Sequence, residues 1–312
     1  TGFCMPDDTV RKGCTVTVLA EDMLTIIRDP EAIAPGLCRA KGTSFEAHAF
    51  FEAPSLRKRE DLYYLIYSSV YNHELCYATG ISPLGPFTCQ GVIVDNCDVG
   101  IDSYKPADRK IAMHCNNHGS FTAIGDKWYM FYHRSTNGTQ FSRQACAEEI
   151  HFDENGRIPQ VCVTSCGLND GPLSCGMYYD AYIACNLFNI RKELQDKEEC
   201  RPMISQDGND SDELPGYVCN MADGATAGFK YFDCRNVTRI DIRARGYMDG
   251  CFEVRISPDG EVLASVPVTE CNTWETFSAP CRIPDGIHAI YITHNGGRVP
   301  TLGGFLLHGD MS

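Results

Sequence analysis

Apolar residues occur along the chain in short runs that are separated by turn signals. Two runs of aromatic and β-branched residues stand at 62–68 and 127–133, and each is followed by another strand-like run, at 74–79 and 142–148. Such residues favour β-strands. Helical periodicity is nearly absent before 191–199, so the pattern predicts an all-β fold.

The first residues follow the same rule. A β-branched strand is expected at 14–20, and a turn at 21–23 leads into a second short strand. Residues 29–31 and 35–36 contain Asp-Pro and Pro-Gly, which favour loops. We therefore expect only a short hairpin here, followed by loop.

The strand pattern then repeats. The runs at 62–68 and 127–133 occupy equivalent places in two units of roughly sixty residues, each with three to four short antiparallel strands. A β-rich unit that repeats at about this length is typical of a propeller blade. The N-terminal part is therefore expected to consist of propeller blades.

The pattern changes from about residue 216. Five short strands with Gly-containing turns between them are expected at 237–244, 251–256, 262–268, 274–279 and 287–293. Evenly spaced strands of this kind indicate a β-sandwich.

Length and composition agree with two domains. The chain has 312 residues, more than one core usually spans. The polar segment 206–215 marks the junction. We predict propeller blades over 1–190, a linker over 191–215 and a jelly-roll β-sandwich over 216–312.

The net charge limits the classes of binding partner. The formal net charge is −14 and the basic residues do not cluster, which argues against nucleic-acid binding. No apolar run is long enough to cross a bilayer, so we expect no membrane partner. A neutral or solvated substrate, such as a sugar, suits this charge.

The chain holds 18 cysteines, spread almost evenly and without a CxxC pair. Buried free thiols are the favoured interpretation, and a disulfide framework or a zinc site near His114, Cys115 and His118 remain alternatives. Free thiols favour a cytoplasmic protein, while secretion stays open.

One carboxylate stands out. Glu52 follows Phe50 and Phe51 and precedes Ala53-Pro54. Apolar surroundings disfavour the charged carboxylate and raise its pKa, which is what a general acid near neutral pH requires. The alternative is a loop carboxylate paired with Arg57 or Lys58, and Glu46 is a lesser candidate for the acid.

Other side chains admit two interpretations each. His118 is an active-site or ion-adjacent histidine, or a core histidine; Arg143 lines a substrate pocket, or pairs with Glu148 or Glu149. His133 is expected to be a packing residue at a strand end. The aromatic residues Phe50, Phe51 and Trp128 line a sugar subsite or belong to the core.

Four motifs in order resemble those of glycoside hydrolase family 43, the five-bladed β-propeller β-xylosidases and α-L-arabinofuranosidases. They are the Phe51-Glu52-Ala53-Pro54 run, Cys76-Tyr77-Ala78-Thr79 with Ser82-Pro83-Leu84-Gly85-Pro86-Phe87, Asn116-Asn117-His118-Gly119 with Trp128 to His133, and Arg143 in Phe-Ser-Arg-Gln. The resemblance covers about residues 13–187. It implies that Glu52 is the general acid, with His118, Arg143 and Phe51 at the substrate.

The C-terminal part resembles a family 6 carbohydrate-binding module, which implies Tyr231 and Trp274 as sugar-contacting residues. Where such modules carry an asparagine-aspartate-tryptophan segment, this chain reads Pro-Thr-Leu-Gly-Gly-Phe at 300–305. The resemblance to family 43 further implies no required cofactor, and a calcium ion on the propeller axis near His118.

Family 43 enzymes invert configuration with an aspartate base and a second aspartate, both of which precede the acid. We find no counterpart of either before Glu52, since Asp29 in Arg-Asp-Pro falls where the family has an inter-blade loop. The sequence thus predicts an incomplete five-bladed propeller: an inverting β-xylosidase or α-L-arabinofuranosidase that lacks its base and is inactive alone.

Two alternatives stay open, a non-catalytic carbohydrate-binding protein and a half-module that needs a partner chain. The expected ligand is a xylo- or arabino-oligosaccharide. Exposed faces of an incomplete propeller also predict a homo-oligomer that covers them.

Overall fold

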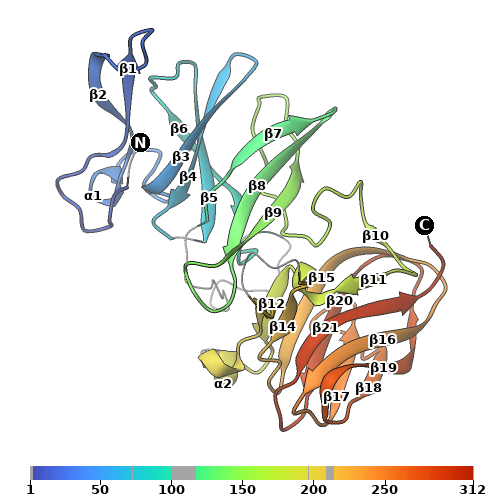
Figure 1. Ribbon diagram of the computed structural model, residues 1–312. Coiled ribbons are helices and arrows are strands. Elements are labelled where there is room, and N and C mark those ends of the chain that lie inside the picture. Colours follow the sequence, from blue (N-terminus) through green and yellow to red (C-terminus); the bar gives the residue numbers. More distant parts are fainter. Residues whose placement is uncertain are drawn as a thin grey trace. The chain divides into compact units, whose positions relative to one another are not determined.

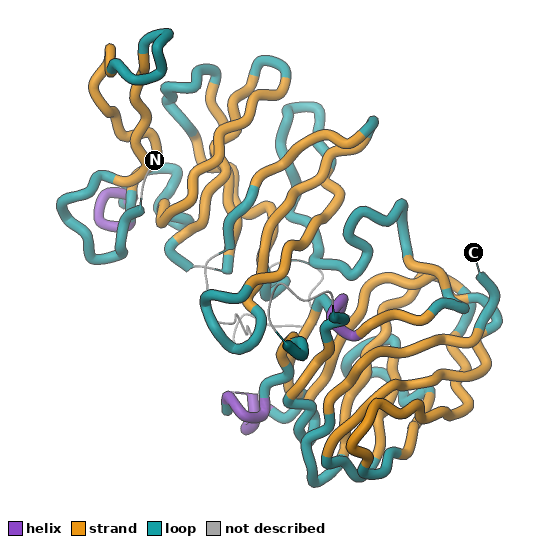
Figure 2. The backbone as a smooth tube through the Cα atoms, viewed as in Figure 1, coloured by secondary structure: helices purple, strands orange, loops and turns teal. Residues whose placement is uncertain are grey.

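The computed structural model describes residues 3–71, 73–99, 101, 117–195, 197–208 and 214–311. Parts of three sequence predictions lie outside these residues: the His114–Cys115 pair, Asn116 of the histidine motif, and the middle of the predicted linker. Strands account for nearly all regular structure (Figure 2), and the only helices in the described ranges are single turns, such as α1 (Leu37–Ala40) and α2 (Lys192–Gln195). The all-β prediction is confirmed.

The described residues form two compact units. The first comprises residues 3–101, 117–134 and 143–162 with the gaps given above, and the second comprises residues 135–142 and 163–311. Each unit is described by itself below.

The first unit contains three antiparallel sheets (Figure 1). A two-stranded sheet pairs β1 (Gly13–Leu19) with β2 (Ile26–Pro35). A four-stranded meander has the order β3-β4-β5-β6, and a three-stranded meander has the order β7-β8-β9. Their bounds are β3 Phe50–Arg59, β4 Leu62–Ser69, β5 Glu74–Gly80, β6 Thr88–Asp95, β7 Ser120–Ile124, β8 Lys127–Ser135 and β9 Arg143–Ile150.

Aromatic side chains join the two meanders. Tyr64 of β4 is fully buried, and its ring meets Phe121 of β7 edge-on at 5.3 Å and Phe152 at 5.7 Å. Its hydroxyl donates to Gly156 O at 2.7 Å, so the polar end of the ring is also satisfied. Strand β4 is apolar from Leu62 to Tyr67, and its residues from Tyr64 onward are buried.

The second unit is a sandwich of two six-stranded sheets (Figure 1). One has the order β10-β15-β20-β17-β18, with β12 also paired to β15; the other has the order β13-β14-β21-β16-β19, with β11 paired to β21. The bounds are β10 Leu173–Ser174, β11 Tyr178–Asp180, β12 Asn186–Asn189, β13 Met203–Ser205, β14 Tyr217–Cys219, β15 Ala225–Cys234, β16 Val237–Gly246, β17 Cys251–Arg255, β18 Ala264–Pro267, β19 Cys271–Ile283, β20 Gly286–Asn295 and β21 Thr301–His308.

Both sheets contribute to one hydrophobic core. Phe229 of β15 and Phe305 of β21 are fully buried, and their rings lie 4.7 Å apart across the sandwich. Strand β16 shows the alternation behind this: Ile240, Ile242 and Ala244 are buried and their neighbours are not. The predicted β-sandwich is confirmed.

The strong strand predictions hold to within a few residues. The runs at 62–68, 74–79 and 127–133 are β4, β5 and β8, and those at 237–244 and 287–293 are β16 and β20. The prediction of a loop at 29–36 is wrong for residues 29–35, which belong to strand β2. Strand β2 continues to Pro35, because several register shifts let it pair with β1 despite its prolines.

Two central sandwich strands were not predicted. Strands β15 and β21 each include glycines, Gly228 in one and Gly303 and Gly304 in the other. Glycine weakens the strand signal, and it is used here where another side chain covers the backbone, as Tyr291 covers Gly228.

The sandwich also begins earlier than the predicted boundary at 190/191. Strands β10, β11 and β12 lie within 173–189 and pair with β15 and β21. The predicted linker likewise contains β13, which pairs with β14. These strands are two to four residues long, too short for periodicity to reveal, so the division falls near residue 163.

Every cysteine in the described part of the chain is a free thiol, as the favoured interpretation predicted. Within those same residues, no helix has the length and apolar character needed to cross a membrane.

Candidate active site

Glu52 lies in an irregular part of β3. It pairs with Ser68 of β4, and the register shifts on both sides of it, between Phe50 and Glu52 and between Glu52 and Ser55. The next residue, Ala53, has φ +55°, a conformation that L-residues rarely adopt. Irregularities of this kind bend a strand and re-aim its side chains.

The carboxyl of Glu52 is half-buried, and burial raises its pKa, as the sequence predicted. The charge that opposes this shift is the guanidinium of Arg143, which lowers the pKa. Arg57, one of the two partners considered from the sequence, is exposed and donates to Leu56 O. Glu46 is exposed and accepts from Gly42 N at 2.8 Å.

Arg143 begins β9 and joins two histidines. Its Nη1 donates to His118 Nε2 at 2.9 Å and to His133 Nε2 at 3.3 Å. The two imidazole rings meet edge-on with centroids 4.2 Å apart. The structure therefore brings together Glu52, His118 and Arg143, three of the residues predicted from the sequence.

The electrostatics agree with this hydrogen bonding. Burial, and then the charge of Arg143, lower the pKa of His118. Burial, the neighbouring His118 and Arg143 lower the pKa of His133 to about 4. Both rings are therefore neutral near pH 7, and a neutral ring nitrogen can accept from a guanidinium.

The expectation that His133 merely packs at a strand end was wrong, because its side chain belongs to this cluster. The signal was a polar residue directly after the apolar run 128–132. The alternative partners for Arg143 are engaged elsewhere: Glu148 accepts from the Tyr132 hydroxyl at 3.0 Å, and Glu149 from Lys127 Nζ at 2.9 Å.

Close backbone contact places His118. A Cβ on Gly119 would lie 1.8 Å from Phe131 O, so the residue after His118 presses its backbone onto β8. Only glycine allows the backbone at position 119 to approach Phe131 O this closely. Hydrogen bonds hold the neighbouring segments: the buried Asn117 donates to His73 O at 3.4 Å, and Asn96 donates to His133 O at 3.1 Å.

The aromatic candidates divide. Phe50 is fully buried in the core. Trp128 packs edge-on against Phe121 and Phe152. Phe50 and Trp128 therefore have structural roles. The ring of Phe51 is half-buried and lies 5.1 Å from that of Phe3; its role at the substrate stays a prediction.

The calcium ion expected near His118 stays a prediction, because residues 102–116 lie outside the described part of the chain. The ring nitrogen Nε2 of His118 accepts from Arg143, and calcium prefers oxygen ligands. Within the described part of the chain, the groups with metal-ligand spacing are His48, Glu74 and Cys76, and His73, Asp95 and Cys97, and neither includes His118.

The two sandwich candidates do not share a face, because Tyr231 lies on β15 and Trp274 on β19 of the other sheet. Guanidinium groups lie over the indole of Trp274: that of Arg245 at 4.3 Å and that of Arg243 at 5.2 Å from the ring centroid. This packing occupies ring surface that a sugar would otherwise contact.

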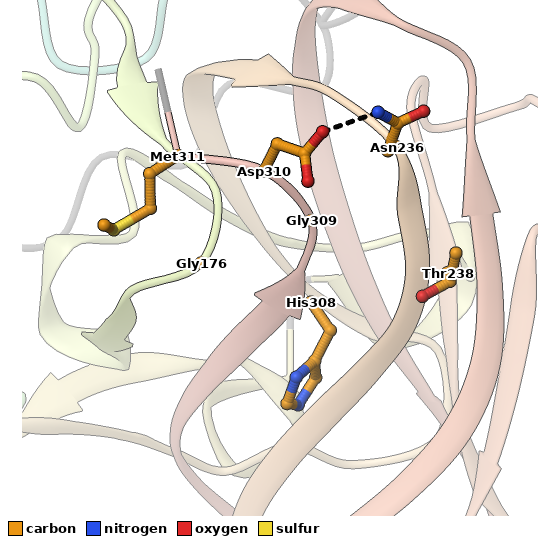
Figure 3. Close-up of a pocket in the computed structure, with 7 residues that line it drawn as sticks. All are labelled: Gly176, Asn236, Thr238, His308, Gly309, Asp310 and Met311. Carbon is orange, nitrogen blue, oxygen red and sulfur yellow. Dashed lines mark hydrogen bonds between the residues drawn. The ribbon is translucent and has the colours of Figure 1, made fainter.

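The sandwich also has an open, polar pocket of about 500 Å³ that sequence reasoning missed (Figure 3). Figure 3 shows Asn236 and Asp310 directed at each other across its edge, with Asn236 Nδ2 donating to Asp310 Oδ2 at 2.5 Å. Thr238 and His308 contribute further polar lining. The sequence signal for this site was an asparagine, Asn236, in the turn between β15 and β16, where its φ is +50°.

Comparison with known proteins identifies the class. The family model for glycosyl hydrolases family 43 matches residues 5–158, which include Glu52, His118 and Arg143. A xylosidase/arabinosidase from Thermoclostridium stercorarium is 52% identical over 99% of this chain and 67% of its own length. The chain belongs to glycoside hydrolase family 43.

Solved structures give looser likenesses. A family 43 arabinoxylan arabinofuranohydrolase from Bacillus subtilis, in complex with cellotetraose, is 18% identical; the match covers 95% of this chain and 59% of that one, with a TM-score of 0.44. A family 6 carbohydrate-binding module from Clostridium stercorarium, in complex with cellobiose, is 15% identical over 45% of this chain and 99% of its own, with a TM-score of 0.37.

Proposed function

We propose that Glu52 is the general acid of an inverting glycosidase that acts on β-xylosides or α-L-arabinofuranosides. The observation that carries this proposal is a half-buried carboxyl with a raised pKa that faces one cation, Arg143. The protonated carboxyl donates its proton to the glycosidic oxygen as the bond to the anomeric carbon breaks. The xylosidase/arabinosidase relative supports the substrate class.

Arg143 has an electrostatic role in this proposal. Burial alone would hold the proton too firmly on Glu52, and the guanidinium stabilises the carboxylate that remains after proton transfer. His118 and His133, as neutral acceptors, hold the guanidinium in place without adding charge. The balance of burial against one cation is what sets the acid strength.

The base belongs outside this cluster in our proposal. Inverting enzymes place an aspartate or glutamate roughly 6.5–9.5 Å from the acid, where it activates water. Arg143 is the one charged group, among the described residues, that shifts the pKa of Glu52. We extend the proposal accordingly: the β3–β6 and β7–β9 meanders are two blades of a five-bladed propeller, and the base comes from a blade other than these two.

The test separates the acid from the rest of the site. Hydrolysis is measured with this chain, and with a chimaera that adds the part of the Thermoclostridium stercorarium relative that this chain does not cover. In the active form, Glu52→Gln should slow hydrolysis of xylobiose by about 10²–10⁴-fold. Hydrolysis of 4-nitrophenyl β-xyloside should fall much less, because 4-nitrophenolate leaves without needing a proton.

Glu46→Gln is the matched control, since it removes an exposed glutamate six residues before Glu52. It should leave both rates unchanged. Equal losses on both substrates for Glu52→Gln would refute the acid role. If the chimaera binds xylo-oligosaccharides by calorimetry yet hydrolyses none, the non-catalytic binding function replaces the enzymatic one.

A further inference from the structure

Three side chains of metal-ligand type meet at the start of β5. Glu74 and Cys76 lie on this strand, and His48 lies just before β3. One ligand atom from each, a ring nitrogen, a carboxylate oxygen and a sulfur, lies within 4.8 Å of the other two. Neither the family match nor the proposed reaction uses this cluster.

Three of its hydrogen bonds converge on a single oxygen. Glu74 Oε2 lies 2.8 Å from His48 Nδ1 and 3.7 Å from Cys76 Sγ, and it also accepts from Ser69 Oγ at 2.8 Å. Zinc bonds of about 2.0–2.3 Å in a tetrahedron place ligand atoms roughly 3.3–3.8 Å apart. Small side-chain movements would therefore convert the hydrogen-bonded cluster into a coordination shell.

The donor set selects the kind of metal. Calcium and magnesium prefer oxygen ligands, whereas one nitrogen, one oxygen and one sulfur suit zinc. A thiolate, a carboxylate and a neutral imidazole together carry two negative charges, which a divalent ion neutralises. The thiol proton of Cys76 passes to water on binding.

Solvent access distinguishes this cluster from the other group with metal-ligand spacing. His73, Asp95 and Cys97 are all buried, and Asp95 Oδ1 already accepts from Cys97 N at 2.7 Å and lies 2.9 Å from His73 Nδ1. The side chains of His48 and Glu74 are 26% and 13% exposed, which provides the path that an entering ion requires.

We propose that His48, Glu74 and Cys76 bind one zinc ion with three protein ligands and an open fourth position. The ion would join the segment four residues before Glu52 to the strand β5. It would thereby brace the start of β3, the strand that carries the candidate acid.

Cobalt(II) tests the proposal, since it replaces zinc and is coloured. The metal-free chain is titrated with Co²⁺ and then with Zn²⁺. One equivalent of Co²⁺ should give a thiolate-to-cobalt charge-transfer band and the visible bands of a tetrahedral ion, and Zn²⁺ should remove both. His48→Ala should weaken zinc binding by at least about tenfold, and Cys76→Ser should abolish the charge-transfer band.

Two control variants locate the ion. Cys97→Ser alters the buried cluster and Cys38→Ser removes an exposed thiol; both should leave the titration unchanged. Loss of the band in Cys97→Ser with retention in Cys76→Ser would overturn the proposal, as would absence of the band in the unaltered chain. Because His48 is partly exposed, His48→Ala should fold, and circular dichroism checks this. Zinc should raise the melting temperature of the unaltered chain, and it should raise that of His48→Ala less at the same zinc concentration.

Discussion

At the scale of single residues, Arg143 couples three titrations. Its positive charge lowers the pKa of Glu52, His118 and His133 together. The sequence could predict that Glu52 has a raised pKa, because two phenylalanines precede it. It could not predict the opposing effect of Arg143, because the two residues stand 91 positions apart in the sequence, on strands of different sheets.

Replacement of Arg143 by Met should therefore raise all three pKa values. Loss of the cation removes a charge that favours the carboxylate and disfavours both imidazolium ions. In an active form, the rate falls as pH rises through the pKa of the acid, so this alkaline limb should move to higher pH. NMR titration of the nine histidines and the pH–rate profile measure the two effects.

The same substitution changes stability on the acid side. A histidine whose folded pKa lies below its usual value binds fewer protons when folded, so stability is full above about pH 6.5 and falls toward pH 4. In Arg143→Met this loss should shrink. Arg57→Met removes one exposed charge from the strand of Glu52 and serves as the control. Unchanged histidine titrations in Arg143→Met would contradict the coupling.

At the scale of elements, prediction succeeded where a strand is long and apolar. Strands β4 and β8 were predicted from their aromatic runs, which stand at equivalent places in the repeating unit. The irregular parts were not predictable: the bulges around Glu52 depend on pairing with β4, and the short strands β10–β12 exist only because β15 and β21 lie beside them. The motif residues of the site were predictable, whereas the place of His133 in the cluster was not.

The contact between the β7 segment and β8 yields a prediction at this scale. Gly119→Ala would place a methyl group 1.8 Å from Phe131 O, so the backbone after His118 must move away. We expect a loss of roughly 3 kcal/mol in the free energy of unfolding, the upper range for overpacking. The NMR signal of His118 should also shift, because its bond to Arg143 is disturbed.

Gly125→Ala is the matched control. Gly125 lies in the turn between β7 and β8 at φ +63°, with nothing within 4 Å of an added Cβ. It should lose only about 1–2 kcal/mol from backbone strain and leave His118 unchanged. The chain has two tryptophans, Trp128 and Trp274. In a Trp274→Phe background, tryptophan fluorescence during denaturant unfolding therefore reports on the first unit alone, through Trp128. Equal losses in the two variants would contradict the clash.

At the scale of the whole molecule, both units bury an apolar core, but one hairpin of the first unit exposes several large apolar side chains together. The sandwich buries one continuous core between its sheets. In the first unit, large apolar residues gather at the tip of the β1–β2 hairpin, where Met23, Leu24, Ile26 and Ile27 are 69%, 86%, 57% and 63% exposed. Apolar surface concentrated in this way is typical of a contact site.

We therefore expect the free chain to associate with a second copy through this tip. Light scattering at increasing concentration should give masses above the 34.6 kDa of one chain, and the double substitution Leu24→Asp with Ile27→Lys should weaken association by roughly tenfold or more. Ile81→Asp is the control, because Ile81 is equally exposed, at 81%, but lies outside the hairpin. A constant mass of 34.6 kDa would contradict self-association, and equal effects of both changes would place the contact elsewhere. Loss of self-association in the active chimaera would instead mean that the added blades cover the same tip.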